Sequence, residues 1–137
     1  MKPTPAFDHI AFNVPDFDQQ VDRLVNDFGM AVQMRSERFA IVSDPATGLK
    51  FEIGRSEDAA VQFRHLGFRA DDVDAAHETL LAAGMETSRP PHRQDFARMY
   101  TSFLAQPGGL EVQLVKYDDG PAFDACGNAP PLALDGT

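Results

Sequence analysis

The sequence predicts one α+β domain built from two copies of a βαβββ module, and three observations support this fold class. Its 137 residues are the size of a single domain. The segments that start at Phe7 and Phe63 resemble each other position by position. In both copies a strand-like alternation is followed by apolar residues at helical spacing. We therefore expect one domain over residues 6–117, with modules at 6–54 and 63–117.

The repeat has identities at its beginning, middle and end. FDHIAFNVPDFDQQVDRL aligns with FRHLGFRADDVDAAHETL, which places His9 over His65. A Gly-Met pair follows in each copy, and the segment GLKFEI aligns with GLEVQL, which places Glu52 over Gln113. Short apolar motifs can agree by chance, but these identities recur in the same order. We interpret them as two copies of one structural unit.

In the first module, Pro15 ends the opening strand, and Asp16 or Asp18 can cap the helix that follows. Gly29 suits the position just after the helix. The strands are expected at 6–14, 31–35, 38–43 and 49–54. The helix should run to about Phe28 and carry one apolar stripe, formed by Phe17, Val21, Leu24, Val25 and Phe28.

In the second module, we expect the helix over about 72–83, with Gly84 ending it and His77 exposed on its polar side. Strands are expected at 63–70, 85–88, 98–105 and 110–116. The Pro90-Pro91 pair indicates an irregular connection between two of these strands. Residues 118–137 are rich in Gly and Pro without a clear period, which predicts a tail without regular structure.

Composition narrows the possible partners. Twelve basic and 21 acidic residues give a net charge of −9. This charge disfavours binding to nucleic acid and to anionic membranes. No apolar run approaches a membrane span, and the N-terminus lacks the apolar core of a signal peptide. The chain has one cysteine, so an intrachain disulfide and a zinc-thiolate cluster are excluded. We expect a cytoplasmic protein that binds a small molecule.

Strand alternation separates the residues beneath the helices from those on the opposite face. The set expected beneath the helices is Ile10, Phe12, Val14, Leu49, Phe51, Ile53, Leu66, Phe68, Ala70, Leu110, Val112 and Leu114. His9, Glu52, His65 and Gln113 lie on the face away from the helices and at equivalent places in the repeat.

These four side chains converge if the modules pack about a pseudo-twofold axis. Two imidazoles, one carboxylate and one amide oxygen form a set that suits Zn, Ni, Co, Mn or Fe. Taken singly, each residue is more simply explained as a surface or satisfied polar residue. Their joint recurrence favours a divalent metal site over a cavity without metal.

The sequence resembles the vicinal oxygen chelate superfamily, which includes glyoxalase I, methylmalonyl-CoA epimerase, extradiol dioxygenases and bleomycin-binding resistance proteins. The resemblance covers about residues 6–117 and is carried by FDHIAFNVPDFD, RHLGFRADDVDAA and PGGLEVQLV. It implies two pseudo-twofold-related modules that form an open mixed-sheet cleft, with helices on the outer face. It also implies metal ligands on the first, fourth, fifth and eighth strands.

The eighth-strand position departs from the family pattern. Counting from Pro107, and aligning the repeat, both place Gln113 where the family has a carboxylate. Glu111 lies two residues earlier on the same face and would be the ligand if the turn were shorter. We favour His9, Glu52, His65 and Gln113 as the ligand set. A glutamine at this position fits the glyoxalase and epimerase types better than the dioxygenases.

The resemblance leads us to expect a metal-dependent lyase or isomerase that acts through a metal-stabilised enediolate on a small oxygenated substrate. A carboxylate must accept the substrate proton; Glu52 is the first candidate and Glu111 the second. Residues on the cleft face or beside it could hold the substrate: Arg69, Asn13, Lys50 and Arg98.

Two alternatives belong to other classes of function. A non-catalytic drug-binding or resistance protein would bind a flat molecule without metal. An Fe(II) ring-cleaving dioxygenase would use His9, His65 and Glu52, with Gln113 displaced. Members of this superfamily often pair, so we expect a homodimer. Whether the cleft forms within one chain or by exchange between subunits stays open.

Overall fold

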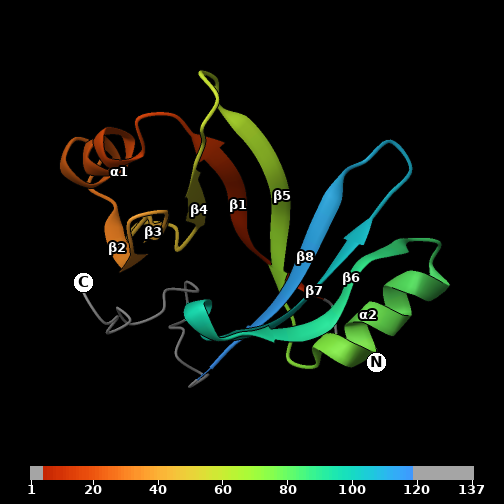
Figure 1. Cartoon of the computed structure of the whole chain (residues 1–137). Coiled ribbons are helices and arrows are strands. Elements are labelled where there is room, and N and C mark those ends of the chain that lie inside the picture. Colours follow the sequence, from red (N-terminus) through yellow and green to blue (C-terminus); the bar gives the residue numbers. More distant parts are fainter. Residues whose placement is uncertain (1–4, 119–137) are drawn as a thin grey trace. The chain divides into compact units, whose positions relative to one another are not determined.

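The computed structural model describes residues 5–118, whose helices and strands are labelled in Figure 1. Among these residues, one compact unit holds residues 9–64 and the other holds residues 5–8 and 65–118. The predicted tail falls, except for its first residue, outside the described part of the chain. No helix of the described part is long and apolar enough to cross a membrane.

The first module forms the four strands and the helix that its pattern predicts. The sheet order is β2-β3-β4-β1, in which β1 and β4 are parallel and the other neighbours antiparallel. The elements are β1 (Ala6–Val14), α1 (Phe17–Asn26), β2 (Ala31–Arg35), β3 (Phe39–Ser43) and β4 (Lys50–Arg55). Gly29 has a φ of 73°, the left-handed conformation expected of the residue that ends a helix.

Asp16 stands at the N-cap of α1, but its side chain makes no capping hydrogen bond. The helix is instead held by its apolar side. Phe17 and Val21 are fully buried and pack with strand residues such as Val14 and Ile53. Two residues expected in this core are exposed, Phe28 (71%) and Leu49 (45%). Each lies in a connection outside the regular elements, because α1 ends at Asn26 before Phe28 and β4 begins at Lys50 after Leu49.

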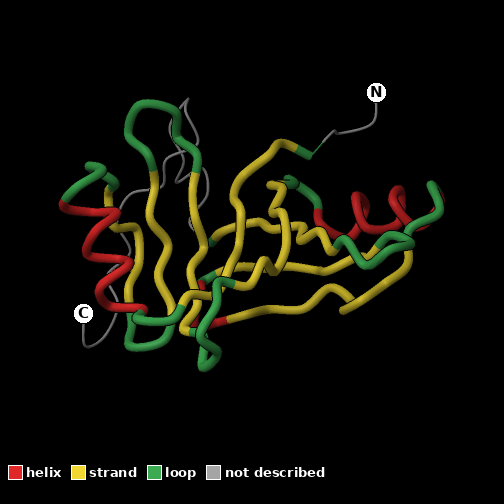
Figure 2. The backbone as a smooth tube through the Cα atoms, turned by 90° about the horizontal axis from the view of Figure 1, so that it is seen from above, coloured by secondary structure: helices red, strands yellow, loops and turns green. Residues whose placement is uncertain are grey.

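The second module repeats this topology, as the alignment predicts. Its sheet order is β5-β8-β7-β6, with β5 and β8 parallel and the remaining pairs antiparallel. The elements are β5 (Gln62–Arg69), α2 (Val73–Ala82), β6 (Glu86–Gln94), a short 3-10 turn (Asp95–Ala97), β7 (Met99–Ala105) and β8 (Glu111–Tyr117). Figure 2 shows one helix lying against strands in each unit.

The irregular connection expected at Pro90-Pro91 is wrong, because β6 runs through both prolines. This strand is the last in its sheet order, and an edge strand tolerates proline on the side that needs no ladder hydrogen bond. Its pairing with β7 shifts register between Thr87 and Arg89 and again between Arg89 and His92. The prolines therefore distort the strand without ending it.

The packing of α2 on the sheet explains why the expected exposure of His77 is wrong. Helix α2 packs against β6, β7 and β8, and His77 is only 3% exposed. Its Nδ1 lies 2.7 Å from Ser102 Oγ, and its Nε2 lies 2.9 Å from Thr87 Oγ1. The core of this unit contains the expected Val112 and Leu114 and further residues, among them Val73, Ala76 and Leu104, whereas Leu110 in the turn is 39% exposed.

Candidate metal centre

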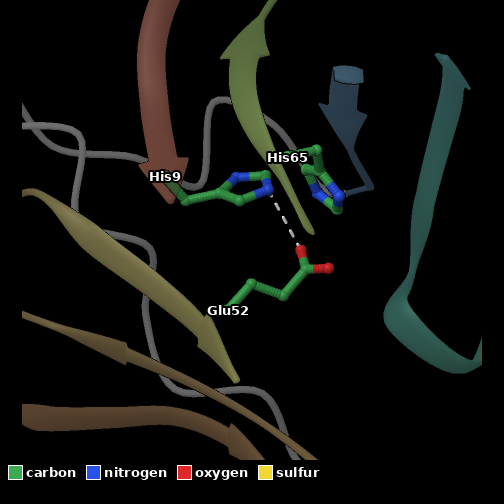
Figure 3. A group of neighbouring side chains, drawn as sticks. All are labelled: His9, Glu52 and His65. Carbon is green, nitrogen blue, oxygen red and sulfur yellow. Dashed lines mark ion pairs between the residues drawn. The ribbon is translucent and has the colours of Figure 1, made fainter. Parts of the chain in front are cut away.

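The first unit holds a buried imidazole–carboxylate pair. His9 on β1 and Glu52 on β4 are 1% and 5% exposed. Their Nε2 and Oε2 atoms lie 3.2 Å apart, as the dashed line in Figure 3 shows. In the parallel register, Ala11 stands opposite Glu52, and it is fully buried. The small side chain of Ala11 leaves room for the longer carboxylate to reach the histidine.

The spacing of this pair fits two ligands of one ion. Ligand atoms about 2.1 Å from a metal at tetrahedral or octahedral angles lie about 3.0 to 3.4 Å apart. The 3.2 Å between His9 Nε2 and Glu52 Oε2 falls within this range. His65 of the second unit is likewise buried, and its imidazole is also a donor that a divalent metal accepts.

The second unit repeats the arrangement with an amide in place of the carboxylate. His65 on β5 and Gln113 on β8 are both 1% exposed. In their parallel register Gly67 stands opposite Gln113, as Ala11 stands opposite Glu52. The pairing of strands thus confirms that the two His-x-small segments are equivalent.

An aromatic side chain that the sequence analysis did not single out lies beside His65. Phe103 on β7 is 4% exposed, and its ring meets the ring of His65 edge-on at 5.3 Å between centroids. The ring of His92 stacks on Phe103 at 6.4 Å, and the guanidinium of Arg89 lies 5.1 Å from its centroid. Phe103 is the register partner of Gln113. It therefore belongs to the ligand-bearing face.

The surroundings of the two eighth-strand candidates differ. The amide Nε2 of Gln113 donates to Thr101 Oγ1 at 2.9 Å and to Met99 Sδ at 3.5 Å, all within the buried sheet. Glu111 is partly exposed and accepts a hydrogen bond from Ser88 Oγ at 2.6 Å. Burial and a directed hydrogen-bond network favour Gln113 as the residue built into this face.

The candidate substrate-binding residues have varied surroundings. Lys50 is 2% exposed and is the register partner of His9. The Asn13 side chain lies against Gly54, where a Cβ would meet Asn13 Oδ1. The Nε atom of Arg69 lies 3.5 Å from the buried carboxylate of Asp8.

Arg98 lies apart from the regular strands, at the end of the 3-10 turn, with a left-handed φ of 54°. Its backbone carbonyl accepts from the amide of Asp118 at 2.8 Å. This position has a structural role in ending the turn before β7. A part in substrate binding stays a prediction.

Comparisons with known proteins agree with the architecture. A family model described as the Glyoxalase/Bleomycin resistance protein/Dioxygenase superfamily matches residues 6–114. No curated protein matches the sequence.

Solved structures with a similar fold include two methylmalonyl-CoA epimerases and a glyoxalase. Methylmalonyl-CoA epimerase from Mycobacterium tuberculosis is 19% identical, with a TM-score of 0.66 over 85% of this chain and 91% of that chain. A selenomethionine methylmalonyl-CoA epimerase is 17% identical, with a TM-score of 0.71 over 87% and 99%. The Mn(II)-bound glyoxalase from Novosphingobium aromaticivorans is 17% identical, with a TM-score of 0.68 over 84% of this chain and 40% of that chain.

At these identities the structural likeness shows the fold, and it confirms the predicted α+β class of paired βαβββ modules. The family match covers most of the chain and confirms the resemblance seen in the sequence motifs. The chain belongs to the Glyoxalase/Bleomycin resistance protein/Dioxygenase superfamily.

Proposed function

We propose that this protein is a metal-dependent lyase or isomerase of the glyoxalase or epimerase type, acting on a small oxygenated substrate. The observation that carries the proposal is the buried His9–Glu52 pair, with its atoms 3.2 Å apart. The second module has His65 and Gln113 at the equivalent positions. Similar folds in methylmalonyl-CoA epimerases and a Mn(II)-bound glyoxalase support this class of reaction.

In this proposal His9, Glu52, His65 and Gln113 hold one divalent ion. When bound, the ion would act as a Lewis acid that stabilises negative charge on a substrate oxygen. The two imidazoles and the amide are neutral, so Glu52 supplies the only protein charge among the four ligands. The site would therefore keep a net positive charge, which favours a substrate that carries adjacent oxygens or becomes anionic.

The reaction also needs a group that takes the proton from carbon. Glu52 is the first candidate because its carboxylate is buried on the ligand-bearing face. Glu111 is the second candidate, and its carboxylate is already bonded to Ser88. A base must come within hydrogen-bond reach of the carbon acid. Lys50 and Arg69 remain candidates for orienting an anionic substrate group.

Solvent exchange at carbon tests the proposal, because every reaction of this type begins by breaking a C–H bond beside a carbonyl. The metal-loaded protein is incubated in D₂O with small hydroxy-carbonyl compounds and with acyl thioesters, methylmalonyl-CoA among them. Mass spectrometry then reports deuterium at the carbon beside the carbonyl. We expect incorporation by the parent protein and its loss in Glu52→Gln. The control, Glu57→Gln, removes a carboxylate that is 86% exposed and should exchange like the parent. The absence of exchange in every substrate, with metal bound, would contradict the proposal.

A second candidate function is binding of a flat small molecule without catalysis. Phe103 favours it, since this ring lies between His65 and His92 on the ligand-bearing face of its unit. Stacking on aromatic rings is a common way to hold planar ligands. Equilibrium binding of planar aromatic compounds to the metal-depleted protein distinguishes the two functions. Tight binding that Phe103→Ala abolishes, together with no solvent exchange, would favour the binding protein.

A further inference from the structure

We propose that Thr101 is a positioning residue for Gln113: its hydroxyl turns the side-chain amide so that Oε1 is the atom presented to a metal. The proposal rests on the metal site of the proposed function. Thr101 is fully buried on β7. Its Oγ1 lies 2.9 Å from Gln113 Nε2, so it accepts a hydrogen bond from the candidate ligand.

The direction of the hydrogen bonds is what fixes the amide. Thr101 Oγ1 donates to the backbone carbonyl of Leu114 at 2.6 Å. A hydroxyl has a single proton, so the oxygen of Thr101 can only accept in its other bond. Its partner must then be the NH₂ end of the Gln113 amide. A flipped amide would bring two acceptor oxygens together.

The second amide hydrogen of Gln113 has a partner as well. Nε2 lies 3.5 Å from Met99 Sδ, a weak acceptor that is likewise buried. Both hydrogens of the NH₂ group are therefore directed toward side chains of β7. The oxygen is the remaining heteroatom of the side chain, and it is the atom of an amide that binds divalent metals.

This arrangement also selects glutamine over glutamate at the eighth-strand position. A carboxylate at residue 113 has no hydrogen to give to Thr101 Oγ1, whose own proton is committed to Leu114. Accommodating it would require Thr101 to turn and give up its hydrogen bond to the Leu114 carbonyl, which is unfavourable. The amide of Gln113 thus suits the hydroxyl of Thr101, and Glu52 provides the carboxylate of the proposed ligand set.

Three variants test the role of the hydroxyl. Thr101→Val removes it with little change of volume, and Thr101→Ser retains it. Thr87→Val is the matched control: it deletes a threonine hydroxyl of the same unit, which bonds to His77 at 2.9 Å. Cobalt(II) is titrated into each metal-free protein, with the affinity measured by calorimetry and the coordination followed by visible absorption.

We expect Thr101→Val to bind cobalt about 10 to 100 times more weakly, with an altered absorption band, as is typical when a residue supporting a metal ligand is removed. Thr101→Ser and Thr87→Val should resemble the parent. Cobalt binding by Thr101→Val with the affinity and spectrum of the parent would overturn the proposal.

A measurement on the metal-free protein separates this proposal from the metal site itself. Nitrogen-15 NMR follows the side-chain NH₂ of Gln113, whose protons should exchange slowly with water in the parent and in Thr101→Ser. They should exchange fast in Thr101→Val. Fast exchange in the parent would overturn the positioning role even if cobalt binds. Slow exchange in a parent that binds no metal would instead overturn the proposed function.

Discussion

Replacement of His9 by alanine tests whether the buried pair holds a metal, through the stability that metal binding adds. A ligand that binds only the folded protein stabilises it by about 2.7 kcal/mol at 100 times its dissociation constant. His9→Ala removes one imidazole, so this gain should vanish at the same metal concentration. The metal-free variant should also lose about 3 kcal/mol, because Glu52 stays buried without the imidazole 3.2 Å away.

Urea unfolding followed by far-ultraviolet circular dichroism measures both effects, since the chain has no Trp for fluorescence. Each protein is unfolded with chelator and with saturating cobalt. His77→Ala is the matched control, because His77 is buried to a similar degree and its ring nitrogens bond to the hydroxyls of Ser102 and Thr87. It should lose stability without metal and keep the full gain on adding metal.

The comparison between the His9 and His77 variants tests whether His9 is a metal ligand. An equal metal-induced gain in His9→Ala and in the parent would refute the assignment of His9 as a ligand. Loss of the gain in His77→Ala would show that the effect reflects general destabilisation rather than the removal of a ligand.

Three further predictions concern stability, each checked by urea unfolding. Two hydrogen bonds from Arg93, 2.9 and 2.6 Å long, hold the pKa of Asp118 below its ordinary value. The Arg93–Asp118 pair should therefore add less than about 1 kcal/mol to the free energy of unfolding above pH 4, and this contribution is lost as the pH falls through the lowered pKa. A difference in stability between the parent and Asp118→Asn that persists at pH 2 would contradict this. Gly54→Ala should cost about 1 to 3 kcal/mol, because the new Cβ meets Asn13 Oδ1, and Asn13→Ala should relieve it. Asp72→Ala should cost about 1 kcal/mol by removing the side-chain cap of α2, and no change would argue against that cap.

The repeat made most of the fold predictable from the sequence. Strand alternation and helical spacing are local patterns, and they located the regular elements to within a few residues, apart from β6. The helix ends were predicted from Gly29 and Gly84, and both glycines have positive φ. The equivalence of Glu52 and Gln113 came from the alignment of the two copies, and the strand register confirms it.

The errors arose where tertiary structure overrides local pattern. Pro90 and Pro91 look like a break, and only the edge position of β6 makes them tolerable within a strand. His77 lies on the side of α2 that appeared polar, but the helix packs against β6 and β7 on that side. A helical wheel cannot show this burial, since it depends on how the helix packs against the neighbouring strands.

The residues that contact the candidate ligands were missed for a similar reason. Thr101 precedes Gln113 by 12 positions and reaches it only through the pairing of β7 with β8. Strand alternation along residues 99–105 could have grouped Met99, Thr101 and Phe103 on one face. Assigning that face to Gln113 requires the register, which the sequence does not show.

The most direct test of the central claim is the number of divalent ions that one chain binds. The metal-free protein is titrated with cobalt(II), manganese(II) and zinc(II), and the bound metal is measured after dialysis. We predict one tightly bound ion per chain for at least one of these metals, and its loss in both His9→Ala and Glu52→Ala. Saturable binding of none of them, or unchanged binding in both variants, would contradict a metal centre built on these residues.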